Sequence, residues 1–235
     1  MKKPGDQKQT AETMKNREYY KIYLADIRPL YDEKLQQAVY DRLPPARQKK
    51  ADRCKHTSAK AACLAVGFLA EYALKSAGYA ECEIGYTDRG APVVSGESVY
   101  ISLSHSGDYA VCAVCDKPVG IDIQRPQKVR TGILKHFFDE NQRKAFLEVY
   151  GCKPDEVYLN SAAQDAFLRQ WTVKESYMKL TGQGMTMGFD RILIQKAQTD
   201  AGLTVKDRRA EFPDAAVKEY TEEGKYYLSV CIQNK

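Results

Sequence analysis

Residues 170–180 read QWTVKESYMKL and predict a helix that is apolar on two opposite sides. At 100° per residue, one apolar side carries Leu168, Trp171, Thr172 and Met178, and the other carries Val173, Tyr177 and Leu180. Glu175 and Lys179 fall on the first of these sides. A helix of this kind is normally enclosed by protein, and an enclosed carboxylate is costly unless a cation or hydrogen bonds compensate for it. The pattern therefore predicts a partner for Glu175.

The partner of Glu175 has two candidate identities. Lys179 follows at i+4, and such a pair stabilises an exposed helix by roughly 0.2–0.5 kcal/mol. A purely structural ion pair would then explain both charges. A bound ligand or metal ion becomes the better explanation only if a second unexplained charge occurs elsewhere in the chain.

The second charge lies in the segment VGIDIQ, residues 119–124. Alternation predicts a strand with Val119, Ile121 and Ile123 on one face, and with Asp122 and Gln124 on the other. Aspartate is depleted in strands, so Asp122 between two isoleucines is either part of a solvent face or part of a site.

Glu175, Asp122 and Gln124 together form a set of hard oxygen ligands, which is typical of magnesium. Magnesium is usually held by one or two carboxylates together with substrate phosphates and waters, so the set predicts a phosphorylated substrate. The turn SLSHSGD, residues 102–108, offers the Ser104 and Ser106 hydroxyls, His105 and free N–H groups for phosphate. Seven cations against one acid between Arg42 and Lys60 form a second region that attracts anions.

Composition narrows the class of protein. The chain has 235 residues, is 43% hydrophobic and 29% charged, and carries a net charge of +5, which is ordinary for a globular protein. No run approaches a membrane span and the first residues lack the core of a signal peptide, so we expect a cytoplasmic protein without membrane contacts. Seven cysteines, an odd count, favour free thiols. The single pair Cys112 and Cys115 supplies only half a structural zinc site, and strand alternation directs its thiols to opposite faces.

The order of predicted elements indicates an α+β fold. A strand at residues 19–27 precedes helices at 32–43, 45–55 and 58–77, then strands up to residue 124. Helices are expected again from Val129 to about Gly182, interrupted near residues 151–155. Strands at RILIQ, LTV, AVKEY and YYLSVCI close the chain.

Three segments carry a family resemblance: SLSHSG, VGIDIQRP and WTVKESYMKLTGQGM, in this order. They resemble the signatures of 4'-phosphopantetheinyl transferases of the surfactin-synthetase-activating type, from about Tyr20 to the C-terminal strands. The resemblance implies a monomer of two similar α+β halves related by a pseudo-twofold axis, with the active site in the cleft between them. The expected boundaries are a flexible tail at 1–18, an N-terminal half at 19–117 and a C-terminal half at 118–235.

The resemblance also implies an activity: transfer of the phosphopantetheine arm of coenzyme A to a serine of an apo acyl, peptidyl or aryl carrier protein, with release of 3',5'-ADP. Magnesium would be held by Asp122, Gln124 and Glu175. The catalytic set would be Asp122, Glu175 as the base for the serine proton, and Lys179 beside the leaving phosphate. The residues expected to contact coenzyme A are Arg47, Lys50, Lys60, Ser104, His105, Lys174 and Lys179.

The sequence departs from the family pattern at two places. Gln124 stands where members often have an acidic residue, and Gly90-Ala91-Pro92 stands where many have Gly-Lys-Pro. Weaker metal binding and one missing cation near the phosphates are the expected consequences.

Two other functions compete with the transferase. A module that binds RNA or another polyanion would explain the region from Arg42 to Lys60, but it leaves Asp122 and Glu175 without a purpose. A different magnesium-dependent phosphoryl-transfer enzyme or nuclease is the third. The basic region lacks aromatic residues for base stacking, so no nucleic acid partner is expected.

Overall fold

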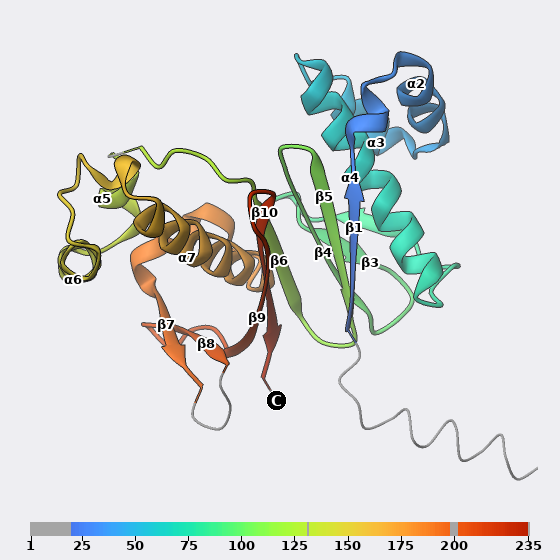
Figure 1. The fold of residues 1–235 in the computed structure, drawn as a ribbon. Coiled ribbons are helices and arrows are strands. Elements are labelled where there is room, and N and C mark those ends of the chain that lie inside the picture. Colours follow the sequence, from blue (N-terminus) through green and yellow to red (C-terminus); the bar gives the residue numbers. More distant parts are fainter. Residues whose placement is uncertain (1–19, 131, 198–201, 235) are drawn as a thin grey trace, which may run out of the picture.

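The computed structural model describes residues 20–130, 132–197 and 202–234. The predicted tail, residues 1–18, lies outside the described residues. The helices and strands form an α+β fold (Figure 1), as predicted. No helix in the described part of the chain is long and apolar enough to cross a membrane.

The first part of the chain forms a three-stranded antiparallel sheet in the order β1-β5-β4. Its elements are β1 (Tyr20–Asp26), η2 (Arg28–Tyr31), α2 (Glu33–Arg42), α3 (Pro45–Ala51), α4 (Thr57–Ser76), β2 (Ile84–Tyr86), β3 (Pro92–Val94), β4 (Tyr100–Ser106) and β5 (Tyr109–Cys115). Helix α4 lies along one face of this sheet (Figure 1), and its many small apolar residues pack there in one core. β2 and β3 form a separate hairpin. Helix α3 is shorter than predicted: it ends at Ala51 and not at residue 55.

The second part forms a five-stranded antiparallel sheet in the order β6-β10-β9-β8-β7. Its strands are β6 (Val119–Gln124), β7 (Ile192–Lys196), β8 (Leu203–Asp207), β9 (Ala215–Glu222) and β10 (Tyr226–Gln233). Its helices are α5 (Ile133–Phe137), α6 (Glu140–Tyr150), η3 (Val157–Leu159), α7 (Ser161–Leu180), η4 (Gly184–Met187) and η5 (Phe189–Arg191). Helix α7 lies across this sheet (Figure 1).

The predicted helical run from Val129 is wrong in two details. Helix begins only at Ile133, and a further break follows Phe137. Asp139 causes the new start, because its carboxylate accepts from the Gln142 N–H while the Gln142 side chain accepts from the Asp139 N–H. This capping box favours a fresh helix over a continuous one.

The two sheets meet through an apolar layer. Its buried members are Val111, Ala113, Cys115, Val119, Ile121, Ile123, Leu228, Val230 and Ile232. Cys112 belongs instead to the core under α4, so the two thiols of the predicted strand lie on opposite faces, as expected. The side chains of Val119, Ile121 and Ile123 therefore pack between the two sheets, and Asp122 lies on the other face of β6.

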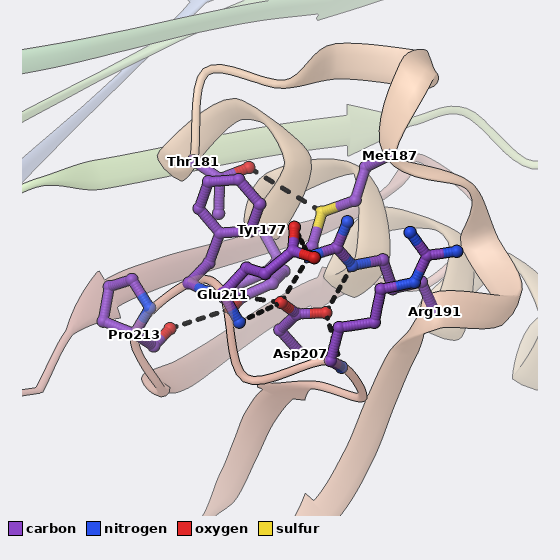
Figure 2. A network of polar contacts seen from close by, with 9 residues as sticks. Tyr177, Thr181, Met187, Arg191, Asp207, Glu211 and Pro213 are labelled. Carbon is purple, nitrogen blue, oxygen red and sulfur yellow. Dashed lines mark hydrogen bonds and ion pairs between the residues drawn. The ribbon is translucent and has the colours of Figure 1, made fainter.

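A buried carboxylate organises the far side of α7 (Figure 2). Asp207 pairs with Arg191 through both oxygens, at 2.5 and 2.6 Å, and accepts from the backbone N–H groups of Arg209, Glu211 and Phe212. These contacts hold the pKa of Asp207 far below its usual range, chiefly through the hydrogen bond from Arg191. The loop that they fix supplies the Pro213 carbonyl, which accepts from the Tyr177 hydroxyl on α7 at 2.8 Å. This hydrogen bond anchors α7 at Tyr177, which lies between Glu175 and Lys179 in the sequence.

Candidate active site

The site depends on a close approach between α7 and β6. Gly120 packs against the backbone of α7: a Cβ atom placed on it would lie 1.8 Å from the Ser176 carbonyl oxygen and 2.6 Å from the Leu180 nitrogen. No side chain other than hydrogen fits there. The glycine of the GID motif therefore lets the strand that carries Asp122 lie directly against the helix that carries Glu175 and Lys179.

Serine side chains of β4 fix β6 from the other sheet. The Ser102 hydroxyl accepts from the Ile121 N–H at 3.0 Å, and the Ser104 hydroxyl donates to Asp122 Oδ1 at 2.7 Å. The Ser106 hydroxyl accepts from the Arg125 N–H at 3.0 Å and donates to Gln124 Oε1 at 3.3 Å. These serines alternate along β4, so they form one row of contacts that joins the edges of the two sheets. We call them the serine row.

Asp122 is buried, and its two oxygens differ. Oδ1 accepts from Ser104 and from Lys179 Nζ, both at 2.7 Å. Oδ2 is buried and has no hydrogen-bond partner among the described residues. A buried carboxylate oxygen without a partner is costly, so it requires a donor or a cation that the protein itself does not supply.

Glu175 does not pair with Lys179, because Lys179 is bound to Asp122 instead. The simplest structural explanation for Glu175 is therefore wrong. Burial raises the pKa of Glu175 to about 7, the charge of Asp122 adds to the rise, and Lys179 opposes it. The two carboxylates thus act on each other electrostatically, and the ammonium group that contacts Asp122 also acts on Glu175. This environment suits a carboxyl that exchanges a proton near neutral pH.

The donor set fits a hard divalent cation. It offers the free oxygen of Asp122, the carboxylate of Glu175 and the amide of Gln124, all oxygen ligands. Among the described residues, no group of three or more His, Cys, Asp or Glu side chains is gathered to hold a metal ion. A cation here would therefore take its remaining ligands from water and from a bound phosphate.

A cavity of about 710 Å³ adjoins this group. Residues lining it include Arg47, Lys50, Arg53, Tyr86, Ser104, His105 and Lys179. Burial lowers the pKa of His105, and the charges of Lys179 and Lys50 lower it further. Four of the lining side chains are cations, so the cavity suits an anionic ligand next to the two carboxylates.

Two predicted ligand-binding residues lie elsewhere. Lys60 does not line the cavity: its ammonium group lies 5.0 Å from the centre of the Tyr40 ring. Lys174 is only 2% exposed, and its ammonium group donates to the carbonyls of Phe137 at 3.2 Å and Phe189 at 2.8 Å. Burial lowers the pKa of Lys174 to about 8. Lys174 therefore holds α5 and η5 against α7, and its placement does not support contact with coenzyme A.

Sequence reasoning missed three contributors to the site: Gly67, Tyr86, and Ser102 of the serine row. The serines alternate in YISLSHS, and that alternation could have shown that Ser102 shares one face with Ser104 and Ser106. Gly67 interrupts an apolar run within its helix, AACLAVGFLA, which is a signal of close packing. Tyr86 comes from a short hairpin, and no local pattern predicts where it packs.

The raised pKa of Glu175 predicts a pH-dependent stability. In metal-free buffer, the protein is expected to lose stability as the pH rises from the ordinary carboxyl range through about 7, because ionisation is easier in the unfolded chain. Glu175→Gln removes this dependence. The variant should melt several degrees above the parent at pH 8 and close to it at pH 5, since about 1 kcal/mol shifts the Tm by roughly 2–4 °C in a chain of this size. If the Tm difference between the variant and the parent were the same at pH 5 and at pH 8, the burial of this charge would be contradicted.

The geometry defines an α+β protein with a cavity lined by four cationic side chains beside a pair of carboxylates. Residues 118–231 match the family described as the 4'-phosphopantetheinyl transferase superfamily. The resemblance drawn from the motifs is thereby confirmed.

Individual relatives agree with the family. The chain is 32% identical over 115 residues to 4'-phosphopantetheinyl transferase gsp of Aneurinibacillus migulanus, covering 47% of this chain and 43% of that protein. It is 32% identical over 145 residues to 4'-phosphopantetheinyl transferase psf-1 of Bacillus pumilus, covering 61% and 58% respectively. The match thus spans about half the length of these relatives. A crystal structure of Helicobacter pylori holo-[acyl-carrier-protein] synthase in complex with coenzyme A is similar at 16% identity and a TM-score of 0.32, covering 41% of this chain and 98% of that one.

Proposed function

We propose that this protein transfers the 4'-phosphopantetheine arm of coenzyme A to a serine hydroxyl of an apo carrier protein and releases 3',5'-ADP. The observation that carries the proposal is the unpartnered, buried oxygen of Asp122, on the same side chain that accepts from Lys179 and beside a Glu175 whose pKa is raised to about 7. The family match of residues 118–231 and the names of the relatives support the same reaction.

Each residue of the site has a role in this proposal. Glu175 accepts the proton of the carrier serine, directly or through a water, as its oxygen attacks the phosphorus that bears the pantetheine arm. The bond between that phosphorus and the oxygen of the leaving 3',5'-ADP breaks. Lys179 lies at the edge of the cavity and offsets the charge that develops on the leaving phosphate. Ser104 orients Asp122 through Oδ1 and leaves Oδ2 available.

Magnesium fits the oxygen ligands of Asp122, Glu175 and Gln124, and these are the residues that would hold it. When bound, it would supply neutralisation of the pyrophosphate of coenzyme A. The amide of Gln124 is neutral, so it binds magnesium less strongly than a carboxylate would. We therefore expect the protein to need a higher magnesium concentration for activity than a site with a carboxylate in this position.

The organisation in two halves is also part of the proposal. Residues 19–117 and 118–235 would be related by a pseudo-twofold axis, with the site in the cleft between them. In support, each half lays one long helix, α4 or α7, across an antiparallel sheet. The serine row and Asp122 lie where these halves meet.

The positive net charge of the chain supports carrier proteins as its partners. Carrier proteins are usually acidic around the modified serine, which suits a chain of net charge +5. We propose acyl, peptidyl or aryl carriers as acceptors, with the enzyme acting as a cytoplasmic monomer and without nucleic acid. The carboxylates of the site oppose a nucleic acid backbone, which argues against a polyanion-binding module.

The test is the reaction itself. The protein, magnesium and coenzyme A are expected to add one phosphopantetheine arm to an apo carrier, detected by intact mass. EDTA should abolish the addition, and so should replacement of the acceptor serine by alanine. The panel should contain acyl, peptidyl and aryl carriers, because partner choice differs among interfaces. Binding of RNA in place of coenzyme A, with no mass gain on any carrier, would favour the polyanion-binding module.

A further inference from the structure

The buried arginine of the cavity feels the charge of the exposed Glu71 but is not in direct contact with a carboxylate among the described residues. Arg47, on α3, is only 5% exposed. No carboxylate in the described part of the chain forms an ion pair with it, and its Nε has no hydrogen-bond partner there. A buried guanidinium group that no carboxylate contacts directly is destabilising unless an anion can reach it. Because Arg47 lines the cavity, that anion would be a ligand.

Tyr86, at the end of β2, holds the guanidinium group of Arg47 in place. The phenol oxygen of Tyr86 accepts a hydrogen bond from Arg47 Nη2, and the guanidinium carbon lies 5.0 Å from the centre of the Tyr86 ring. The ring and the hydroxyl together restrict the plane of the guanidinium fork. Tyr86 itself lines the cavity and is partly exposed there.

Gly67, on α4, leaves the space that the Arg47 side chain occupies. A Cβ atom placed on Gly67 would lie 2.8 Å from both Cγ and Nε of Arg47, closer than van der Waals contact allows. The atoms in the way belong to a side chain and not to the backbone. A methyl group at residue 67 would therefore displace Arg47 without breaking α4, in which alanine is favoured over glycine.

The hydroxyl of Tyr86 keeps a donor for the ligand. Burial raises the pKa of Tyr86, and the charge of Arg47 opposes the rise. The phenol thus stays protonated at neutral pH, and while its oxygen accepts from Arg47 its own O–H remains able to donate. Lys50 and Arg53 line the same cavity, so the donors converge on a dianion rather than on a single negative charge.

We propose that Tyr86 and Gly67 are positioning residues that hold Arg47 for a phosphate monoester. This inference rests on the proposed function for the identity of the ligand, which would be the 3'-phosphate of coenzyme A. Tyr86 and Gly67 would then determine the preference for coenzyme A over dephospho-coenzyme A, which lacks that group. Arg47 contacts the phosphate, and the other two residues act through Arg47.

The test compares the binding of coenzyme A and dephospho-coenzyme A by calorimetry. Tyr86→Leu and Gly67→Ala are each expected to raise the Kd for coenzyme A about tenfold, and to leave the Kd for dephospho-coenzyme A within about twofold. Tyr86→Phe keeps the ring and should lose less than Tyr86→Leu. Tyr100→Leu is the matched control, because Tyr100 is exposed on β4 and does not line the cavity. The Tm of Gly67→Ala is measured in parallel and should lie within a few degrees of the parent, because the obstructing atoms belong to a side chain. A tenfold loss of affinity in the folded variant then cannot be attributed to unfolding.

The outcomes separate this inference from the transferase proposal. A parent protein that modifies carriers but binds both ligands equally would overturn the phosphate subsite and leave the transferase intact. Equal losses for the two ligands in Tyr86→Leu and Gly67→Ala, or unchanged affinities, would also overturn it. A parent protein that binds neither ligand would remove both proposals together.

Discussion

Replacement of Gly120 by alanine is expected to lower turnover by at least about 10²-fold and to lower the Tm by several degrees. A Cβ atom at 1.8 Å from the Ser176 carbonyl cannot be accommodated, and the obstacle is helix backbone rather than a flexible side chain. Helix α7 must therefore move away from β6. Because Lys179 Nζ reaches Asp122 Oδ1 across this contact at 2.7 Å, a displacement of about an ångström separates the groups of the site.

Gly132→Ala is the matched control for this prediction. Gly132 precedes α5 with a φ of −62°, and a Cβ atom there meets nothing within 4 Å. Thermal melts and transfer rates of the two variants should be measured side by side. If Gly120→Ala kept the Tm and turnover of Gly132→Ala, the close packing of β6 on α7 would not be what assembles the site.

The sequence predicted the elements that carry the site because their patterns are local. Alternation in VGIDIQ places Asp122 opposite the isoleucines, and the structure has the strand over the same residues, Val119–Gln124. Helical periodicity placed Glu175 and Lys179 on one side of α7, and both come to lie near Asp122. The same periodicity could not show that Lys179 bonds to Asp122 rather than to Glu175, because the partner comes from another strand.

Lys174 was predicted to contact coenzyme A because it belongs to the signature motif, but the direction of its side chain from the helix decides what it contacts. Lys174 neighbours Glu175 in the signature, but one residue turns the helix by 100°, which directs Lys174 towards the core of Phe137 and Phe189. Its neighbours at i+3 and i+4, Tyr177 and Met178, are apolar, and this could have shown that Lys174 shares an enclosed face. The position of Tyr86 could not be predicted, since its contact with Arg47 of α3 depends on how the tertiary fold places a short hairpin.

Asp122→Asn is expected to keep the fold and to lower turnover by at least about 10²-fold at saturating magnesium and coenzyme A. The amide has the size of the carboxylate and can still accept from Ser104 or Lys179, so the serine row remains in place. Its charge is lost, however, and with it the anionic oxygen that has no protein partner. Asp214→Asn is the matched control, because Asp214 pairs with Lys206 in an ion pair that is 42% exposed on both sides. Transfer to an apo carrier should be followed across a magnesium titration, with the Tm of both variants measured in parallel. Turnover within a few-fold of the parent at every magnesium concentration would show that Asp122 is a structural partner of Lys179 and not part of the reaction site.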